Sequence, residues 1–87
     1  METYVVIFTI STPFEEWAKA YDSSINGQKE AGITSIYRGF LKGDPTQICS
    51  IMQAKAGRLN AFMAENAEVV AASGHVLESI VISTYKP

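Results

Sequence analysis

The sequence predicts one α+β domain over residues 1–87, with the element order β-α-β-β-α-β. Three observations support this fold class. Four segments are dense in β-branched and aromatic residues, which is typical of strands. Two further segments place apolar residues three or four positions apart, which is typical of amphipathic helices. The length of 87 residues leaves room for a single domain with an economical core.

The composition excludes several classes of protein. The chain is 47% hydrophobic and 18% charged with a net charge of −2, so it resembles neither a disordered chain nor a basic nucleic-acid binder. Its apolar runs are far shorter than the roughly 20 residues of a membrane span, and no signal peptide is predicted. The single cysteine, Cys49, is expected to be a small buried hydrophobe rather than a metal ligand. We therefore expect a cytoplasmic protein with no metal, cofactor, membrane or nucleic-acid partner.

The first strand is predicted over residues 3–10, where both alternating sets of side chains are largely apolar. One set is Tyr4, Val6, Phe8 and Ile10, and the other is Val5 and Ile7 with two threonines. A strand that is apolar on both faces is typical of the centre of a sheet that is covered on both sides.

The first helix is expected to begin with a capping box, in which Thr12 is the N-cap, Pro13 the first helical residue and Glu15 the returning side chain. We expect it to continue to Ala31 and to end at Gly32. Its buried stripe comprises Phe14, Trp17, Ala18, Tyr21 and Ile25, whose helical spacing assigns them to the core.

A hairpin follows, with strands predicted at residues 34–41 and 47–54. The turn between them, residues 42–46, contains a glycine, an aspartate and a proline, which favours a loop of the longer type.

The second helix begins after Gly57, and Asn66 marks a kink or the cap of a second short helix that ends at Ser73. Phe62 lies on its buried stripe, so truncation to alanine should cost ~3–5 kcal/mol. The last strand is predicted over residues 79–85.

This element order, with right-handed crossovers and both helices on one face, predicts a ferredoxin-like antiparallel sheet of order 4-1-3-2. The first strand then lies centrally, and its second apolar face is left without a cover. We therefore expect a homodimer joined through the sheet face opposite the helices, with about 1,200–2,000 Å² buried in total.

His75 is the only histidine and hence the main candidate for acid–base chemistry near neutral pH. We expect it to be solvent-accessible in the loop before the last strand, where a general base could work with Tyr37 or Tyr85 as proton donor. The alternative is that His75 only meets the carbonyl end of the second helix, where a cation is favoured.

Arg38 is a charged residue inside a predicted strand. It could anchor an anionic ligand, together with His75 and Tyr85 as ligand-binding candidates. The alternative is an edge-strand charge that blocks unwanted pairing or forms a salt bridge. The tripeptide Arg38-Gly39-Phe40 also matches the start of the RNA-recognition signature. That signature belongs on the third strand of such a domain, however, and the net charge of this chain is −2 where an RNA-binding domain is basic.

Several segments resemble the dimeric α/β barrel superfamily, small ferredoxin-like domains that pair sheet to sheet. They are FEEWAKAYDS, AGITSIYRGF, LNAFMAENAEVVAASG and the closing strand after GHVLES. More narrowly, AGITSIYRG with SGHVLESIVIS resembles an uncharacterised cyanobacterial family of unknown function. Members of the superfamily include cofactor-free monooxygenases acting on aromatic polyketides, isomerases, polyketide cyclases and haem-degrading enzymes.

Three functions remain open from the sequence. The first is a module that binds a small apolar or aromatic metabolite between the sheets without turnover. The second is a cofactor-independent enzyme, of monooxygenase or polyketide-cyclase type, that uses His75 and a tyrosine. The third is a structural or regulatory dimer with a filled interior.

Overall fold

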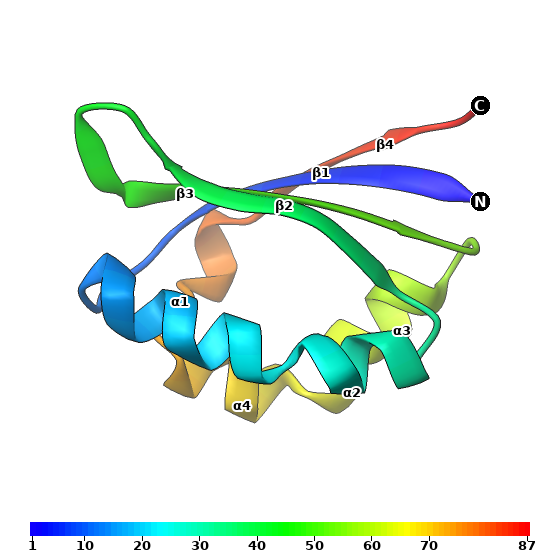
Figure 1. Ribbon diagram of the computed structural model, residues 1–87, viewed down its shortest axis with the longest axis horizontal. Coiled ribbons are helices and arrows are strands. Elements are labelled where there is room, and N and C mark those ends of the chain that lie inside the picture. Colours follow the sequence, from blue (N-terminus) through cyan, green and yellow to red (C-terminus); the bar gives the residue numbers. More distant parts are fainter.

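The computed structural model describes all of residues 1–87. It contains one four-stranded antiparallel sheet of order β2-β3-β1-β4, with every helix on the same side of it (Figure 1). The strands are β1 (Glu2–Thr9), β2 (Thr34–Leu41), β3 (Asp44–Ala54) and β4 (Val81–Tyr85), and the helices are α1 (Phe14–Ser23), α2 (Ile25–Glu30), α3 (Arg58–Glu65), α4 (Ala67–Ala72) and the 3₁₀ turn η1 (Leu77–Ser79). The predicted ferredoxin-like α+β fold is confirmed, with β1 in the interior of the sheet. No helix has the length and apolar character needed to cross a membrane.

The first predicted helix is two helices, because the chain departs from regular helical geometry at Ser24. The hydroxyl of Ser24 donates to the carbonyl of Tyr21 at 2.6 Å, and its backbone N–H bonds the same carbonyl at 2.9 Å. Such side-chain bonds to the preceding turn compete with the regular helical ladder. The predicted capping box was also wrong: Pro13 is the N-cap, and the Thr12 hydroxyl donates to the carbonyl of Ser73 instead.

The hairpin is tighter than predicted. Leu41 pairs directly with Asp44, so that the loop is only Lys42 and Gly43, and Gly43 adopts a φ of +90°. Such a backbone conformation is accessible to glycine without steric cost. Asp44 accepts bonds from the backbone and hydroxyl of Thr46, which holds the start of β3.

An irregularity in β2 decides which side chains reach the helices. The pairing with β3 shifts between Ser35 and Tyr37, which leaves Ile36 as an extra residue. Ser35 therefore pairs on the helix-facing side and Tyr37 on the opposite side, while Arg38 again faces the helices. Sequence alternation alone would place Ile36 on the same face as Arg38.

The second helix is divided as the sequence analysis allowed. Asn66 lies between α3 and α4, and its side-chain amide donates to the carbonyl of Phe62 at 2.9 Å. The last strand is shorter than predicted, because η1 occupies residues 77–79.

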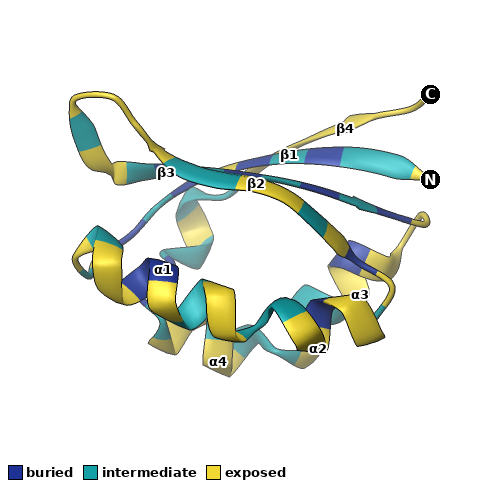
Figure 2. Ribbon diagram, viewed as in Figure 1, coloured by how far each residue is buried: buried dark blue, intermediate teal, exposed yellow.

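The core lies between the sheet and the helices (Figure 2). Its members come from alternate positions of the two inner strands, from the helices, and from the connections at Ile10 and Ile33: Tyr4, Val6, Phe8, Ile10, Trp17, Ala18, Ile33, Ile48, Met52, Ala54 and Leu59. The other face of the sheet has no cover, so Ile7 is 45% exposed and Val81 is 61% exposed.

Candidate functional site

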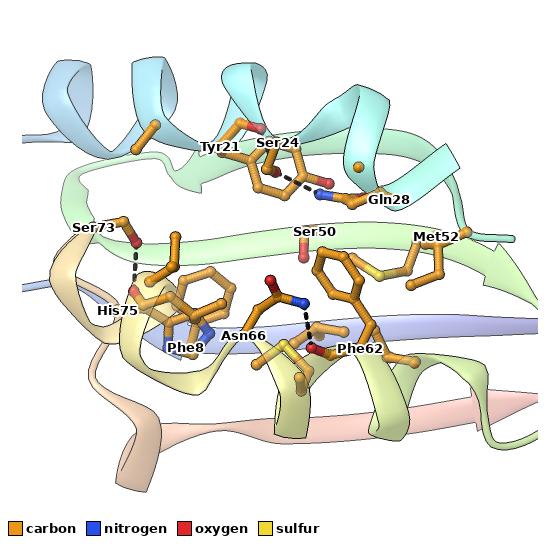
Figure 3. Close-up of a pocket in the computed structure, with 18 of the residues that line it drawn as sticks. Phe8, Tyr21, Ser24, Gln28, Ser50, Met52, Phe62, Asn66, Ser73 and His75 are labelled. Carbon is orange, nitrogen blue, oxygen red and sulfur yellow. Dashed lines mark hydrogen bonds between the residues drawn. The ribbon is translucent and has the colours of Figure 1, made fainter. Parts of the chain in front are cut away.

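The structure contains a cavity of about 380 Å³ between the sheet and the helices. Figure 3 shows it from the helix side, with α1 and α2 along one wall, α3 and α4 along the other, and β1 and β3 as its floor. Fourteen of its 22 lining residues are hydrophobic. Small residues leave this volume unfilled, since Ala20, Ser24 and Gly27 line the α1–α2 wall and Ser50 lies in the middle of the floor.

All three buried polar side chains of the chain line this cavity. They are Gln28, Ser50 and His75, which are 4%, 2% and 8% exposed respectively. Burial of a polar group is costly unless it is hydrogen-bonded, so three buried polar residues around one cavity indicate a specific role for them. The cavity therefore combines apolar walls with a few convergent polar groups, which is the usual composition of a small-molecule site.

His75 reaches the cavity because the loop after α4 is bound to the end of β1. His75 forms an isolated antiparallel bridge with Ile10, and the N–H of Ser11 donates to the carbonyl of Gly74 at 2.8 Å. The imidazole then stacks on Phe8, with ring centroids 3.7 Å apart and planes 5° from parallel. The prediction that His75 is solvent-accessible was wrong, because these long-range contacts draw it under the sheet.

The ionisation of His75 follows from this position. Burial lowers the pKa of its imidazole to about 4, because the charged form would lose its hydration. The ring is therefore neutral near pH 7, which also argues against the alternative of a cationic side chain at the helix end. Its Nδ1 atom has no hydrogen-bond partner in the protein.

Gln28 is held on the α1–α2 wall by a short chain of hydrogen bonds. Its amide nitrogen donates to the hydroxyl oxygen of Ser24 at 2.9 Å, and that hydroxyl in turn donates to the carbonyl of Tyr21. The phenol of Tyr21 is bonded to Ser35 on β2 at 2.7 Å. The break between α1 and α2 is thus part of the cavity wall.

The other residues proposed from the sequence lie elsewhere. Tyr37 and Tyr85 are 51% and 60% exposed on the uncovered face of the sheet, on the opposite side from His75. Arg38 faces the helices but forms a two-point salt bridge with Asp22, at 3.0 and 2.6 Å, and does not line the cavity. This ion pair raises the pKa of Arg38 and lowers that of Asp22. Arg38 therefore forms a salt bridge, which the sequence analysis gave as an alternative to binding an anionic ligand.

The tyrosine that shares the cavity with His75 is Tyr21, which the sequence analysis assigned to the core. Gln28 and Ser50 were missed. One signal existed in the sequence: Gln28 lies seven residues after Tyr21 and three after Ile25, so it is a polar residue within an apolar helical stripe. Cys49 is half-buried on the uncovered sheet face rather than in the core. The structure brings no three His, Cys, Asp or Glu side chains together as a metal site.

The fold and its cavity define a small ferredoxin-like domain, and comparison with known proteins gives its family. The chain belongs to a family described as a domain of unknown function (DUF3764), whose model matches residues 1–87. The expected relationship to an uncharacterised family is thereby confirmed.

Two solved structures share the fold. One is titled "Putative antibiotic biosynthesis monooxygenase from Nitrosomonas europaea"; it is 18% identical, with a TM-score of 0.66, covering 100% of this chain and 98% of that one. The other is a protein of the same description from Deinococcus radiodurans; it is 8% identical, with a TM-score of 0.65, covering 100% of this chain and 92% of that one. At these identities the similarity concerns the fold alone. Comparison with curated proteins found no match.

Proposed function

We propose that the protein binds a small, mostly apolar molecule in the cavity between its sheet and its helices. The observation that carries this proposal is the placement of all three buried polar side chains around one apolar cavity. A volume of about 380 Å³ lies within the range of ligand sites. The sequence analysis placed the ligand between two sheets, whereas this cavity lies on the helix side within one chain.

Aromatic rings at the cavity favour a planar ligand. Trp17 and Tyr21 stack with ring centroids 5.1 Å apart on the α1 wall, and Phe8 and His75 stack on the other side. Ring systems bind well against such surfaces, because stacked and edge-to-face contacts add to the area that is buried. An aromatic or quinone-like molecule therefore fits the cavity better than a flexible aliphatic chain.

A thermal-shift screen against flavins, haem, quinones and aromatic polyketides tests this proposal, because a ligand that binds the folded state raises the melting temperature. Ala20→Leu adds volume inside the cavity and should abolish the shift. Ala61→Leu makes the same change on the exposed surface of α3 and should retain it. If no compound shifts the wild-type protein, the binding proposal fails and a structural or regulatory dimer is favoured.

We further propose that the protein is a homodimer joined through the uncovered sheet face. Val5, Ile7 and Ile51 lie on this face in register, with Val81 beside Ile7. A contiguous apolar patch that is exposed on the surface of a domain marks an interaction surface. A second copy related by a two-fold axis can cover it with the same patch.

Sedimentation at micromolar concentration should then give about twice the chain mass of 9.5 kDa. Ile7→Lys places a charge in the middle of the patch and should give a folded monomer. Ala61→Lys, on the helix surface, is the control and should remain dimeric. A wild-type monomer under these conditions would contradict the dimer proposal without affecting the cavity.

A cofactor-independent enzyme is the second candidate, favoured by the neutral imidazole of His75 at the cavity wall. Its partner in acid–base chemistry would be Tyr21, since Tyr37 and Tyr85 lie on the opposite face. A pKa of about 4 makes His75 a weak base, so binding without turnover is the primary proposal. If a compound that binds is also converted, loss of turnover in His75→Gln with binding retained would establish this role. Absence of turnover in the wild-type protein would contradict a catalytic role for His75.

A further inference from the structure

Two buried side-chain polar atoms have no hydrogen-bond partner in the protein, and both belong to residues that line the cavity. They are Oε1 of Gln28 and Nδ1 of His75. Buried polar groups in folded proteins are almost always paired, and an unpaired one destabilises the structure. The concurrence of both exceptions in one cavity indicates a partner that the protein itself does not supply.

The orientation of the Gln28 amide is determined by its neighbours. The hydrogen of the Ser24 hydroxyl is used in the bond to the carbonyl of Tyr21, so the Ser24 oxygen can only accept. The amide nitrogen of Gln28 satisfies it at 2.9 Å (Figure 3). Rotating the amide by half a turn would place two oxygens against each other with no hydrogen between them. Gln28 therefore keeps its oxygen as the unpaired atom, and that atom is an acceptor.

The local fold of the helices produces this arrangement. Ser24 lies between α1 and α2, where its hydroxyl bonds back to the preceding turn. Gln28 follows four residues later, one helical turn along the same face. A continuous helix with alanine at position 24 would leave the amide free to rotate, so the break and the orientation of the amide have one cause.

We infer that Gln28 is a specificity-determining residue, which accepts a hydrogen bond from a hydroxyl or N–H group on the molecule bound in the cavity. This inference rests on the proposed function, because it specifies which apolar molecules the cavity selects. A hydroxyl group is the better match of the two, since after donating its one hydrogen to Gln28 its oxygen can still accept from Nδ1–H of His75. The selected class is thus hydroxylated aromatic compounds, in preference to the corresponding ethers or hydrocarbons.

The test compares two probes that share a ring system and differ in one donor, 2-naphthol and 2-methoxynaphthalene. Titrations followed by calorimetry or by backbone amide NMR shifts should show that the wild-type protein prefers the naphthol by about three- to tenfold, the range expected of one neutral hydrogen bond. Gln28→Leu should bind both probes equally, with its affinity for the ether unchanged. Gln47→Leu makes the same substitution on β3, away from the cavity, and should keep the preference.

A second variant tests the orientation of the amide. Ser24→Ala removes the acceptor that holds the amide nitrogen, so the preference for naphthol should fall while the ether gains affinity. Equal binding of the two probes by the wild-type protein, or a preference that survives in Gln28→Leu, would overturn the inference and leave the cavity proposal standing. If neither probe binds, this inference is overturned, and if the thermal-shift screen also gives no shift, the cavity proposal is overturned with it.

Discussion

The buried imidazole of His75 makes the stability of this protein depend on pH in a window where few other side chains titrate. Burial against Phe8 lowers its pKa from 6.5 to about 4 in the folded state. The unfolded chain therefore takes up a proton below pH 6.5, whereas the folded protein does not until about pH 4. The stabilisation is fully present above pH 6.5 and is lost as the pH falls toward 4.

The size of the effect follows from the separation of the two pKa values. One pKa unit corresponds to about 1.4 kcal/mol, so the full effect is at most about 3 kcal/mol, and residual hydration of the ring reduces it to a loss of up to about 2 kcal/mol between pH 7 and pH 5. Aspartate and glutamate side chains remain largely ionised at pH 5, so they add little to this change. A loss of 2 kcal/mol is a large fraction of the stability of a small domain.

Urea denaturation at pH 7, 6 and 5 measures this change directly, provided that the dependence on urea is constant across the series. His75→Phe keeps a ring against Phe8 but does not titrate, so its free energy of unfolding should be flatter over the same range. The difference between the two slopes isolates the contribution of His75 from that of the carboxylates. Identical slopes for the two proteins would refute the reasoning and would mean that His75 is hydrated in solution.

Three further predictions concern stability. Gly27→Ala should raise the free energy of unfolding by ~0.5–1 kcal/mol, because Gly27 is helical and the added methyl group meets no atom within 4 Å. Gly74→Ala should lower the free energy of unfolding by more than ~1 kcal/mol, because Gly74 has a φ of +102°. Equal effects at the two positions would contradict this account. Arg38→Ala should lower the free energy of unfolding by less than ~1 kcal/mol, and by less still at high salt, since its partner Asp22 is 54% exposed. A larger loss of stability in thermal denaturation would indicate a further role for the guanidinium. Phe62→Ala should cost ~2 kcal/mol in urea denaturation rather than the 3–5 kcal/mol of a fully enclosed phenylalanine, because the side chain is half-buried at the cavity wall; a cost above 4 kcal/mol would mean that the cavity is closed in solution.

The most informative pattern in the sequence was the apolar character of both faces of β1. It placed this strand inside the sheet and indicated that the face opposite the helices needs a cover. The register of β1 with both of its neighbours agrees with the first of these expectations. Periodicity and turn residues act over a few neighbouring positions, so they can be read without knowledge of the tertiary structure.

The site depended on contacts that no local pattern contains. His75 is buried by a bridge to Ile10, which lies 65 residues earlier, and its aromatic partner Phe8 lies in β1, two residues before Ile10. The irregularity in β2 sends Tyr37 to the outer face, although the strand itself was correctly predicted.

The element order, the central position of β1 and the apolar outer face could all be predicted, because each follows from the spacing of side chains along one segment of the sequence. That Gln28, Ser50 and His75 share one cavity could not be predicted in this way, since they come from a helix, a strand and a loop. The physical reason is that a cavity is volume left unfilled where several elements meet. Its walls are therefore set by how the elements pack against one another rather than by any one of them.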